Sequence, residues 1–154
     1  MQEMHIGKNG NIFALPQNGE AVCVTTNGIV KPNGHAVMGA GIALESNKLF
    51  HLSKKLGGYL NKYGNRVFNM GRFSNGSQCL TVITFPTKYD WRDNSDIELI
   101  HQSAIQLVEL CNKFGITKCY LPPPGCGCGK LDWNTVKNCL SSILDDRFII
   151  VFRY

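Results

Sequence analysis

Two segments of the chain share one order of elements: a strand, a glycine-rich turn and a helix. The first leads from the apolar, β-branched Ala21–Thr26 through a long loop to Gly39-Ala40-Gly41-Ile42 and a helix. The second leads from residues 117–121 through the glycine-rich residues 122–129 to a helix that Asp132 caps. Such crossings place backbone N–H groups and helix N-termini at the carboxyl ends of strands, where a phosphate is favoured. The pattern predicts an α/β fold with room for a diphosphate.

Other segments fill in the same architecture. Residues 52–63 predict a helix, and residues 66–73 and 79–85 predict a hairpin around the turn at 74–77. A long helix follows Ser95 as its cap, with apolar residues recurring at three and four positions up to Cys111 and Gly115 just beyond its last turn. Residues 148–154 predict a final strand. Together these elements predict one α/β domain over residues 1–154, with three layers (α/β/α) and a mixed central sheet.

Composition limits the possible partners and surroundings. The sixteen Lys and Arg residues give a net charge of +5 but are scattered, which disfavours a groove-reading nucleic-acid binder. Seven cysteines form no C-x-x-C pair, and Cys126 and Cys128 lack further ligands at zinc spacing, so no metal and a reducing cytoplasm are expected. No opening segment reads as a signal peptide, and no apolar run nears the roughly 20 residues of a membrane span.

The first glycine turn carries little information on its own. Gly39-Ala40-Gly41 matches neither G-x-G-x-x-G nor G-x-x-x-x-G-K-[ST]. On spacing alone, a purely structural turn is at least as good an interpretation as a ligand-binding loop.

The residues around both turns nevertheless resemble a known family. TTNGIVKPNGHAVMGAGIAL and LPPPGCGCGKLDWNTVK are similar to the two ligand loops of macro domains. FPTKYDWRDNSDIELI between them is similar to the FPTK-x-x-W-R segment of the phage-like and toxin–antitoxin branch. The resemblance covers residues 10–151. It implies a macro-domain fold that binds ADP-ribose and hydrolyses an ADP-ribosyl linkage on a protein, nucleic acid or metabolite, without a cofactor.

The same resemblance implies a set of ligand-binding residues. Asn11 stands where macro domains usually have an aspartate that accepts the adenine amino group, and an amide can still accept one such bond. Small residues in the two loops would let the backbone approach the diphosphate. The implied ligand-binding residues are Asn11, Ile12, Gly39, Ala40, Gly41, Ile42, Gly125, Cys126, Gly127, Cys128 and Gly129.

Three residues are candidates for catalysis. Lys88 matches the lysine of FPTK, and it could stabilise a leaving group as an ammonium or attack the C1'' carbon as an amine. Asn27 matches the asparagine beside the distal ribose, and His35 could act as a general base. The glutamate-cleaving relatives pair their lysine with a loop aspartate, whereas this chain has Gly129 at that position. No acid is therefore assigned.

Several interpretations remain open from the sequence. An ADP-ribose-1''-phosphate phosphatase would depend on His35, and a non-enzymatic reader would bind ADP-ribose without turnover. A nucleic-acid-binding α/β module is the alternative from another class. Trp91 covers the site or packs beneath it, and Phe152 and Tyr154 stack on adenine or close the core. The expected partners are ADP-ribose or an ADP-ribosylated protein or nucleic acid, with no membrane, for a protein expected to be a monomer.

Overall fold

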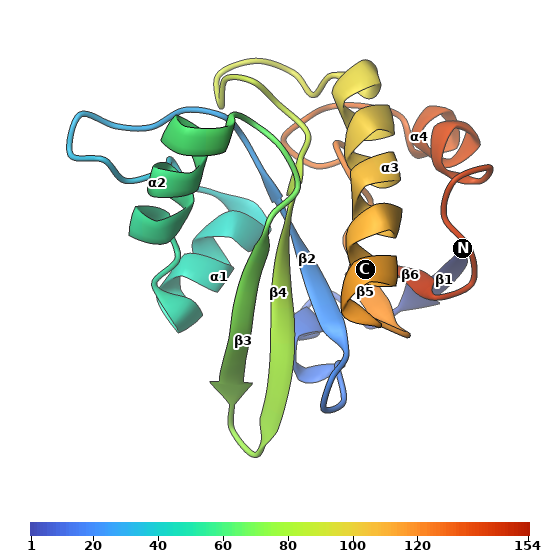
Figure 1. The fold of residues 1–154 in the computed structure, drawn as a ribbon. Coiled ribbons are helices and arrows are strands. Elements are labelled where there is room, and N and C mark those ends of the chain that lie inside the picture. Colours follow the sequence, from blue (N-terminus) through green and yellow to red (C-terminus); the bar gives the residue numbers. More distant parts are fainter.

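A six-stranded sheet crosses the centre of the protein, of which the computed structural model describes all residues 1–154 (Figure 1). Its order is β1-β6-β5-β2-β4-β3, and every neighbouring pair is parallel except β3 with β4. The predicted mixed sheet is thereby confirmed. The strands are β1 Gln2–His5, β2 Ala21–Thr26, β3 Asn69–Asn75, β4 Gln78–Pro86, β5 Cys119–Leu121 and β6 Phe148–Phe152.

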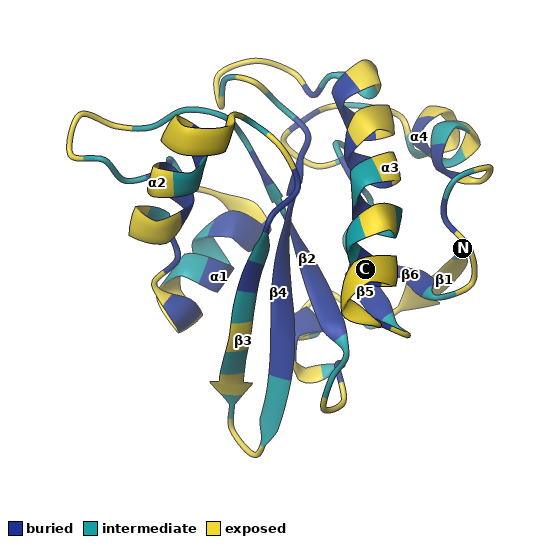
Figure 2. Ribbon diagram, in the orientation of Figure 1, coloured by how far each residue is buried: buried dark blue, intermediate teal, exposed yellow.

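Helices cover both faces of this sheet. Side chains of α1 (Gly41–Phe50) and α2 (Ser53–Tyr63) belong to one buried apolar cluster, and those of α3 (Ile97–Phe114) and α4 (Trp133–Leu140) belong to a second. The sheet between the two clusters is largely buried, and the outer helix faces are exposed (Figure 2). This is the three-layer α/β/α arrangement that the sequence predicts. None of the helices combines the length and the apolar composition that crossing a membrane requires.

The structure adds two elements that the sequence pattern does not indicate. The edge strand β1 pairs in parallel with β6, although its four residues are exposed and mostly polar. A short 3₁₀ helix, η1 (Ile12–Ala14), follows, and Asn11 caps it by accepting a hydrogen bond from the Phe13 N–H. Neither has the apolar periodicity on which strand and helix prediction depends.

The cap of the long helix lies one residue later than predicted. Asp96, and not Ser95, is the N-cap of α3, and its carboxylate accepts hydrogen bonds from the Glu98 and Leu99 N–H groups. Both residues are cap formers, so local sequence does not choose between them. The predicted ends at Gly115, with a φ of 66°, and at the Asp132 cap of α4 are confirmed.

Several element boundaries also differ from the prediction. The β3–β4 hairpin is confirmed, but β3 begins at Asn69 and runs on to Asn75, because Gly76 at a φ of 68° makes the turn tighter than expected. The strand predicted from residue 117 begins at Cys119, α4 ends at Leu140, and β6 ends at Phe152. These shifts leave the order of elements unchanged.

Candidate functional site

A cleft of about 720 Å³ opens beyond the carboxyl ends of β2 and β4, and both glycine turns line it. One wall is the segment that enters α1, and the opposite wall is the loop between β5 and α4. Carboxyl ends of parallel strands in one sheet meet at a common edge, so the two strand–turn–helix units converge there. The lining residues from the two turns are Gly39, Ala40, Gly41, Ile42, Gly125, Gly127, Cys128 and Gly129.

The first wall presents the N-terminus of α1 to the cleft. Ala40 is the N-cap and has no side-chain oxygen, so no side chain of the helix entry satisfies the first N–H groups. Gly41, the first helical residue, has a φ of 56°, a conformation that disfavours any residue with a β-carbon. An uncapped ten-residue helix facing a cleft offers unpaired donors and a positive dipole end to an anion.

The second wall is a compact loop held by its own backbone bonds. The Leu131 N–H donates to the Gly125 carbonyl at 2.9 Å, and the Lys130 N–H donates to the Gly127 carbonyl at 3.1 Å. Space around Gly127 is open, since a β-carbon there would meet nothing within 4 Å. Gly127 and Cys128 are both exposed and line the cleft.

Gly129 is buried, and its neighbour explains why no acid stands at this position. The Ser95 N–H donates to the Gly129 carbonyl at 3.0 Å, so the two backbones run side by side. A β-carbon on residue 129 would collide with the Ser95 hydroxyl oxygen and the Gly125 carbonyl. The Ser95 hydroxyl itself is buried without a hydrogen-bond partner. An aspartate at position 129 has no room in this fold.

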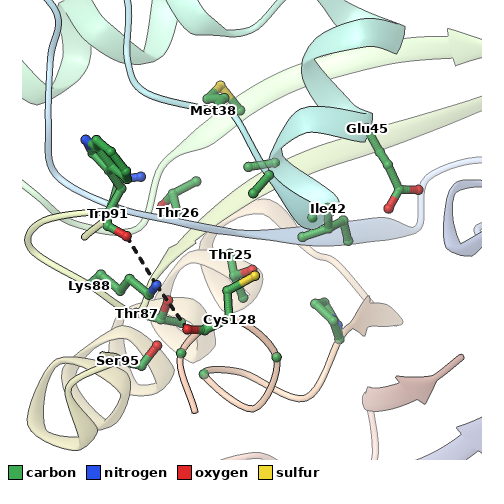
Figure 3. Close-up of a pocket in the computed structure, with 18 of the residues that line it drawn as sticks. Thr25, Thr26, Met38, Ile42, Glu45, Thr87, Lys88, Trp91, Ser95 and Cys128 are labelled. Carbon is green, nitrogen blue, oxygen red and sulfur yellow. Dashed lines mark hydrogen bonds between the residues drawn. The ribbon is translucent and has the colours of Figure 1, made fainter. Parts of the chain in front are cut away.

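Lys88 lies at the rim of the cleft between its walls. Its Nζ donates to the carbonyls of Trp91 and Cys128, both at 3.5 Å (Figure 3). Bonds of 3.5 Å are at the weak limit of hydrogen bonding, which leaves the amine available to a ligand. The Lys88 carbonyl accepts from Asn65 Nδ2 at 3.0 Å, so the backbone is fixed while the side-chain tip is loosely held.

Asn27 also lines the cleft, but its amide is engaged within its own loop. Nδ2 donates to the Val37 carbonyl and Oδ1 accepts from the Ile29 N–H, each at 3.0 Å. The amide therefore joins the start of the 27–38 loop to its end. One N–H and one lone pair remain for a ligand.

Four predicted site residues do not line the cleft. His35 hydrogen bonds through Nδ1 to the Ser53 hydroxyl at 2.9 Å, at the start of α2. Asn11 is exposed and caps η1, and Ile12 is fully buried in the core. The thiol of Cys126 donates to the Pro124 carbonyl at 3.5 Å inside its loop. None of these four residues therefore lines the cleft, although Cys126 belongs to the second glycine turn.

The aromatic candidates divide between cleft and core. Trp91 lines the cleft with about half of its surface exposed. Phe152 is buried and packs against the rings of His5, Trp133 and Tyr154 at centroid distances of 5.0 to 5.5 Å. Phe152 therefore closes the core on the side of α4, and Tyr154 is exposed outside the cleft.

Three charged side chains line the cleft, and the sequence pattern points to only one of them. Besides Lys88 these are Glu45 of α1 and Arg153, which follows β6. Glu45 accepts two hydrogen bonds from Arg153 Nη1, at 3.0 and 2.9 Å. Figure 3 shows Glu45 on the opposite side of the cleft from Lys88. Glu45 stands three residues after Ile42, and that helical spacing is the one sequence signal that would have placed it on the cleft.

The aspartates near Lys88 or the second glycine turn in the sequence bind groups outside the cleft. Arg92 binds Asp90 through two hydrogen bonds to its side chain, and this ion pair lowers the pKa of the Asp90 carboxyl to about 2. Asp132 caps α4 by accepting from the Thr135 N–H. Neither carboxylate lines the cleft, and the Lys88 ammonium hydrogen bonds to two backbone carbonyls and forms no ion pair.

Comparison with known proteins identifies similar folds. No family model matches the chain. The chain is 28% identical over 141 residues to a DNA ADP-ribosyl glycohydrolase of Thermus aquaticus, an alignment that covers 88% of this chain. Among solved structures, the macrodomain of Mycobacterium tuberculosis DarG superposes with a TM-score of 0.73 and 26% identity over 99% of both chains. Thermosipho africanus DarTG in complex with ADP-ribose superposes with a TM-score of 0.75 and 20% identity, covering 99% of this chain and 42% of that one.

These relatives differ from the chain in length. It spans between 14% and 36% of the curated relatives that it matches. The similarity therefore concerns one domain of larger proteins, and it establishes a fold for this chain.

Proposed function

We propose that this chain, which has the macrodomain fold, binds ADP-ribose in its cleft and hydrolyses an ADP-ribosyl linkage there, with ADP-ribosylated DNA as its substrate. The observation that carries the proposal is the convergence of both glycine turns on one cleft, with the uncapped N-terminus of α1 facing it. A diphosphate matches that arrangement because it accepts hydrogen bonds from many N–H groups at once.

The comparisons support the choice of ligand and of substrate. The relative that aligns over most of this chain is named a DNA ADP-ribosyl glycohydrolase. A solved structure of the same fold holds ADP-ribose. The scattered positive charge of the chain fits this interpretation, because a substrate that is recognised through its ADP-ribose does not require a positively charged surface along a DNA duplex.

Lys88 is the residue that we assign to the chemical step. Hydrolysis adds water to the C1'' carbon of the distal ribose, breaks the bond to the base, and transfers a proton to the base. As an ammonium, Lys88 stabilises the charge that develops on the departing base. As an amine, it attacks C1'' and forms a covalent sugar intermediate that water then hydrolyses. Either role agrees with an Nζ that is loosely held at the rim and forms no ion pair.

The remaining residues bind and position the ligand. The cleft-lining residues of the two turns, without Cys126, offer backbone donors to the diphosphate, while Asn27 offers its free N–H to a ribose hydroxyl. We give no role in the reaction to His35, since its ring lies against Ser53 outside the cleft.

Binding and turnover measurements with single variants test the proposal. We expect calorimetry to show ADP-ribose binding by the wild type and by Lys88→Ala. Hydrolysis of an ADP-ribosylated single-stranded oligonucleotide should fall at least about 100-fold in Lys88→Ala, and His35→Ala should keep wild-type activity. Borohydride trapping of a sugar adduct on the wild type distinguishes the covalent role from the electrostatic one.

Three results would each contradict a different part of the proposal. Full activity of Lys88→Ala on DNA would remove the lysine from the mechanism. Activity on ADP-ribose-1''-phosphate that depends on His35 would indicate a phosphatase. Binding without turnover of DNA-linked, protein-linked or phosphate-linked ADP-ribose would indicate a reader.

A further inference from the structure

An ion pair lies at the end of the cleft away from Lys88. Arg153 Nη1 donates to both carboxylate oxygens of Glu45, at 3.0 and 2.9 Å, and both residues line the cleft. The two residues are 108 positions apart in the chain, so only the fold brings them together. This pair is distinct from the glycine turns and from the lysine, and the sequence motifs do not include it.

Local structure explains why both side chains reach the cleft. Glu45 lies one turn after the start of α1, on the same side of the helix as Ile42. Alternation along β6 places Val151 and Arg153 on one face of the sheet and Phe152 on the other. The pair therefore joins α1, whose N-terminus faces the cleft, to the end of β6.

Stability alone does not account for this pair. The Glu45 side chain is 42% exposed and the Arg153 side chain 26% exposed. An ion pair exposed to this degree contributes little to folding stability. Both side chains are therefore partly accessible to a ligand in the cleft.

The site needs a group that recognises the base, and the residue expected for that task is elsewhere. Asn11 lies outside the cleft, and its Oδ1 already accepts from the Phe13 N–H at 3.0 Å. In the proposed binding mode Lys88 lies at the distal ribose and the turns lie at the diphosphate, so the nucleoside extends towards the opposite end of the cleft. Glu45 is the one carboxylate that lines the cleft, and Arg153 is the cation beside it.

We propose that Glu45 and Arg153 form the base subsite and select a 6-aminopurine over a 6-oxopurine, an inference that rests on the proposed function. The Glu45 carboxylate accepts a hydrogen bond from the amino group of adenine. Hypoxanthine presents a carbonyl oxygen at the same position, which repels the carboxylate. The guanidinium plane of Arg153 stacks on the purine ring, and its two hydrogen bonds to Glu45 hold the carboxylate in position.

Calorimetry with two ligands tests the selection directly. ADP-ribose and its hypoxanthine counterpart, IDP-ribose, are titrated into the wild type, Glu45→Gln, Arg153→Met and the control Glu109→Gln, an exposed position on α3. The wild type and Glu109→Gln should bind ADP-ribose at least about tenfold more tightly than IDP-ribose. Glu45→Gln should bring the two affinities within about threefold, because an amide both accepts from an amino group and donates to a carbonyl.

The outcomes separate this inference from the function on which it rests. Arg153→Met should weaken the binding of both ligands, since it removes the stacking partner, and it should also reduce the preference, since Glu45 loses the ion pair that positions it. If the wild type binds ADP-ribose but Glu45→Gln keeps the wild-type preference, the base subsite is wrong and the proposed function stands. If the wild type has no preference, the subsite is equally wrong. If the wild type does not bind ADP-ribose, both proposals fail.

Discussion

The Ser95 hydroxyl occupies the space that a β-carbon on Gly129 would need. The two residues also share a backbone hydrogen bond of 3.0 Å between the Ser95 N–H and the Gly129 carbonyl. Ser95 and Gly129 therefore pack as one unit that fixes the second glycine turn against the start of α3. Packing against Ser95 therefore excludes an aspartate, or any other residue with a side chain, from position 129.

Substitution of Gly129 should therefore destabilise the fold. We expect Gly129→Ala to lower the free energy of unfolding by about 1–3 kcal/mol, because a methyl group would be forced into a filled space that includes a backbone carbonyl. Gly127→Ala is the matched control, since its surroundings are open, and it should change stability by less than about 0.5 kcal/mol. Urea unfolding of both variants measures the difference. Equal stability of the two variants would show that the Ser95 side chain moves aside at little cost in free energy.

Asn65 should act on the reaction through Lys88. Its Nδ2 donates to the Lys88 carbonyl at 3.0 Å, and it does not line the cleft. Asn65→Ala should loosen the segment that carries the lysine, lowering kcat about tenfold through misplacement of Nζ. The Kd for ADP-ribose should stay within about twofold. A parallel loss of kcat and of ADP-ribose affinity would instead indicate a general disturbance of the cleft.

The Asn27 side chain should stabilise its own loop in addition to contacting the ligand. Asn27→Ala removes two part-buried hydrogen bonds, to Val37 and Ile29, and should destabilise the protein by about 1–3 kcal/mol. ADP-ribose affinity should fall with it, because the same loop leads to Gly39. Asn33→Ala, at an exposed position in this loop, is the control and should cost less than about 1 kcal/mol. Wild-type thermal stability of Asn27→Ala would refute the bracing role.

The thiol of Cys126 should resist alkylation at neutral pH. Burial, and then the charge of Asp132, raise its pKa from 9.0 to about 11, so the reactive thiolate is scarce below that pH. Iodoacetamide labelling followed by mass spectrometry should modify the exposed Cys128 first, with Cys126 gaining reactivity only as the pH approaches about 11. Because the folded-state pKa is the higher one, the protonated thiol stabilises the fold at neutral pH. That contribution is lost as the pH rises from 9.0 to about 11. Rapid modification of Cys126 at pH 7 would contradict this assignment.

Local sequence patterns predicted most of the helices and strands. They did not predict β1 or the residue that caps α3. Strands β2 and β6 are apolar and β-branched, and α3 repeats its apolar residues at helical spacing, so each can be identified from neighbours along the chain. Strand β1 escaped detection because its polar residues form a strand only by pairing with β6, more than 140 positions away. Ser95 and Asp96 are adjacent cap formers, and packing of Ser95 against Gly129 left Asp96 as the cap.

The sequence by itself determined the α/β class, the two strand–turn–helix units and the candidate lysine, because each depends on residues close together in the chain. Only the tertiary structure decided which of these groups share a cleft. It brought Lys88 to the glycine turns, left His35 and Asn11 outside, and joined Glu45 to Arg153. The physical reason is that a binding site is set by distances across the sheet, and spacing along the chain does not encode those distances.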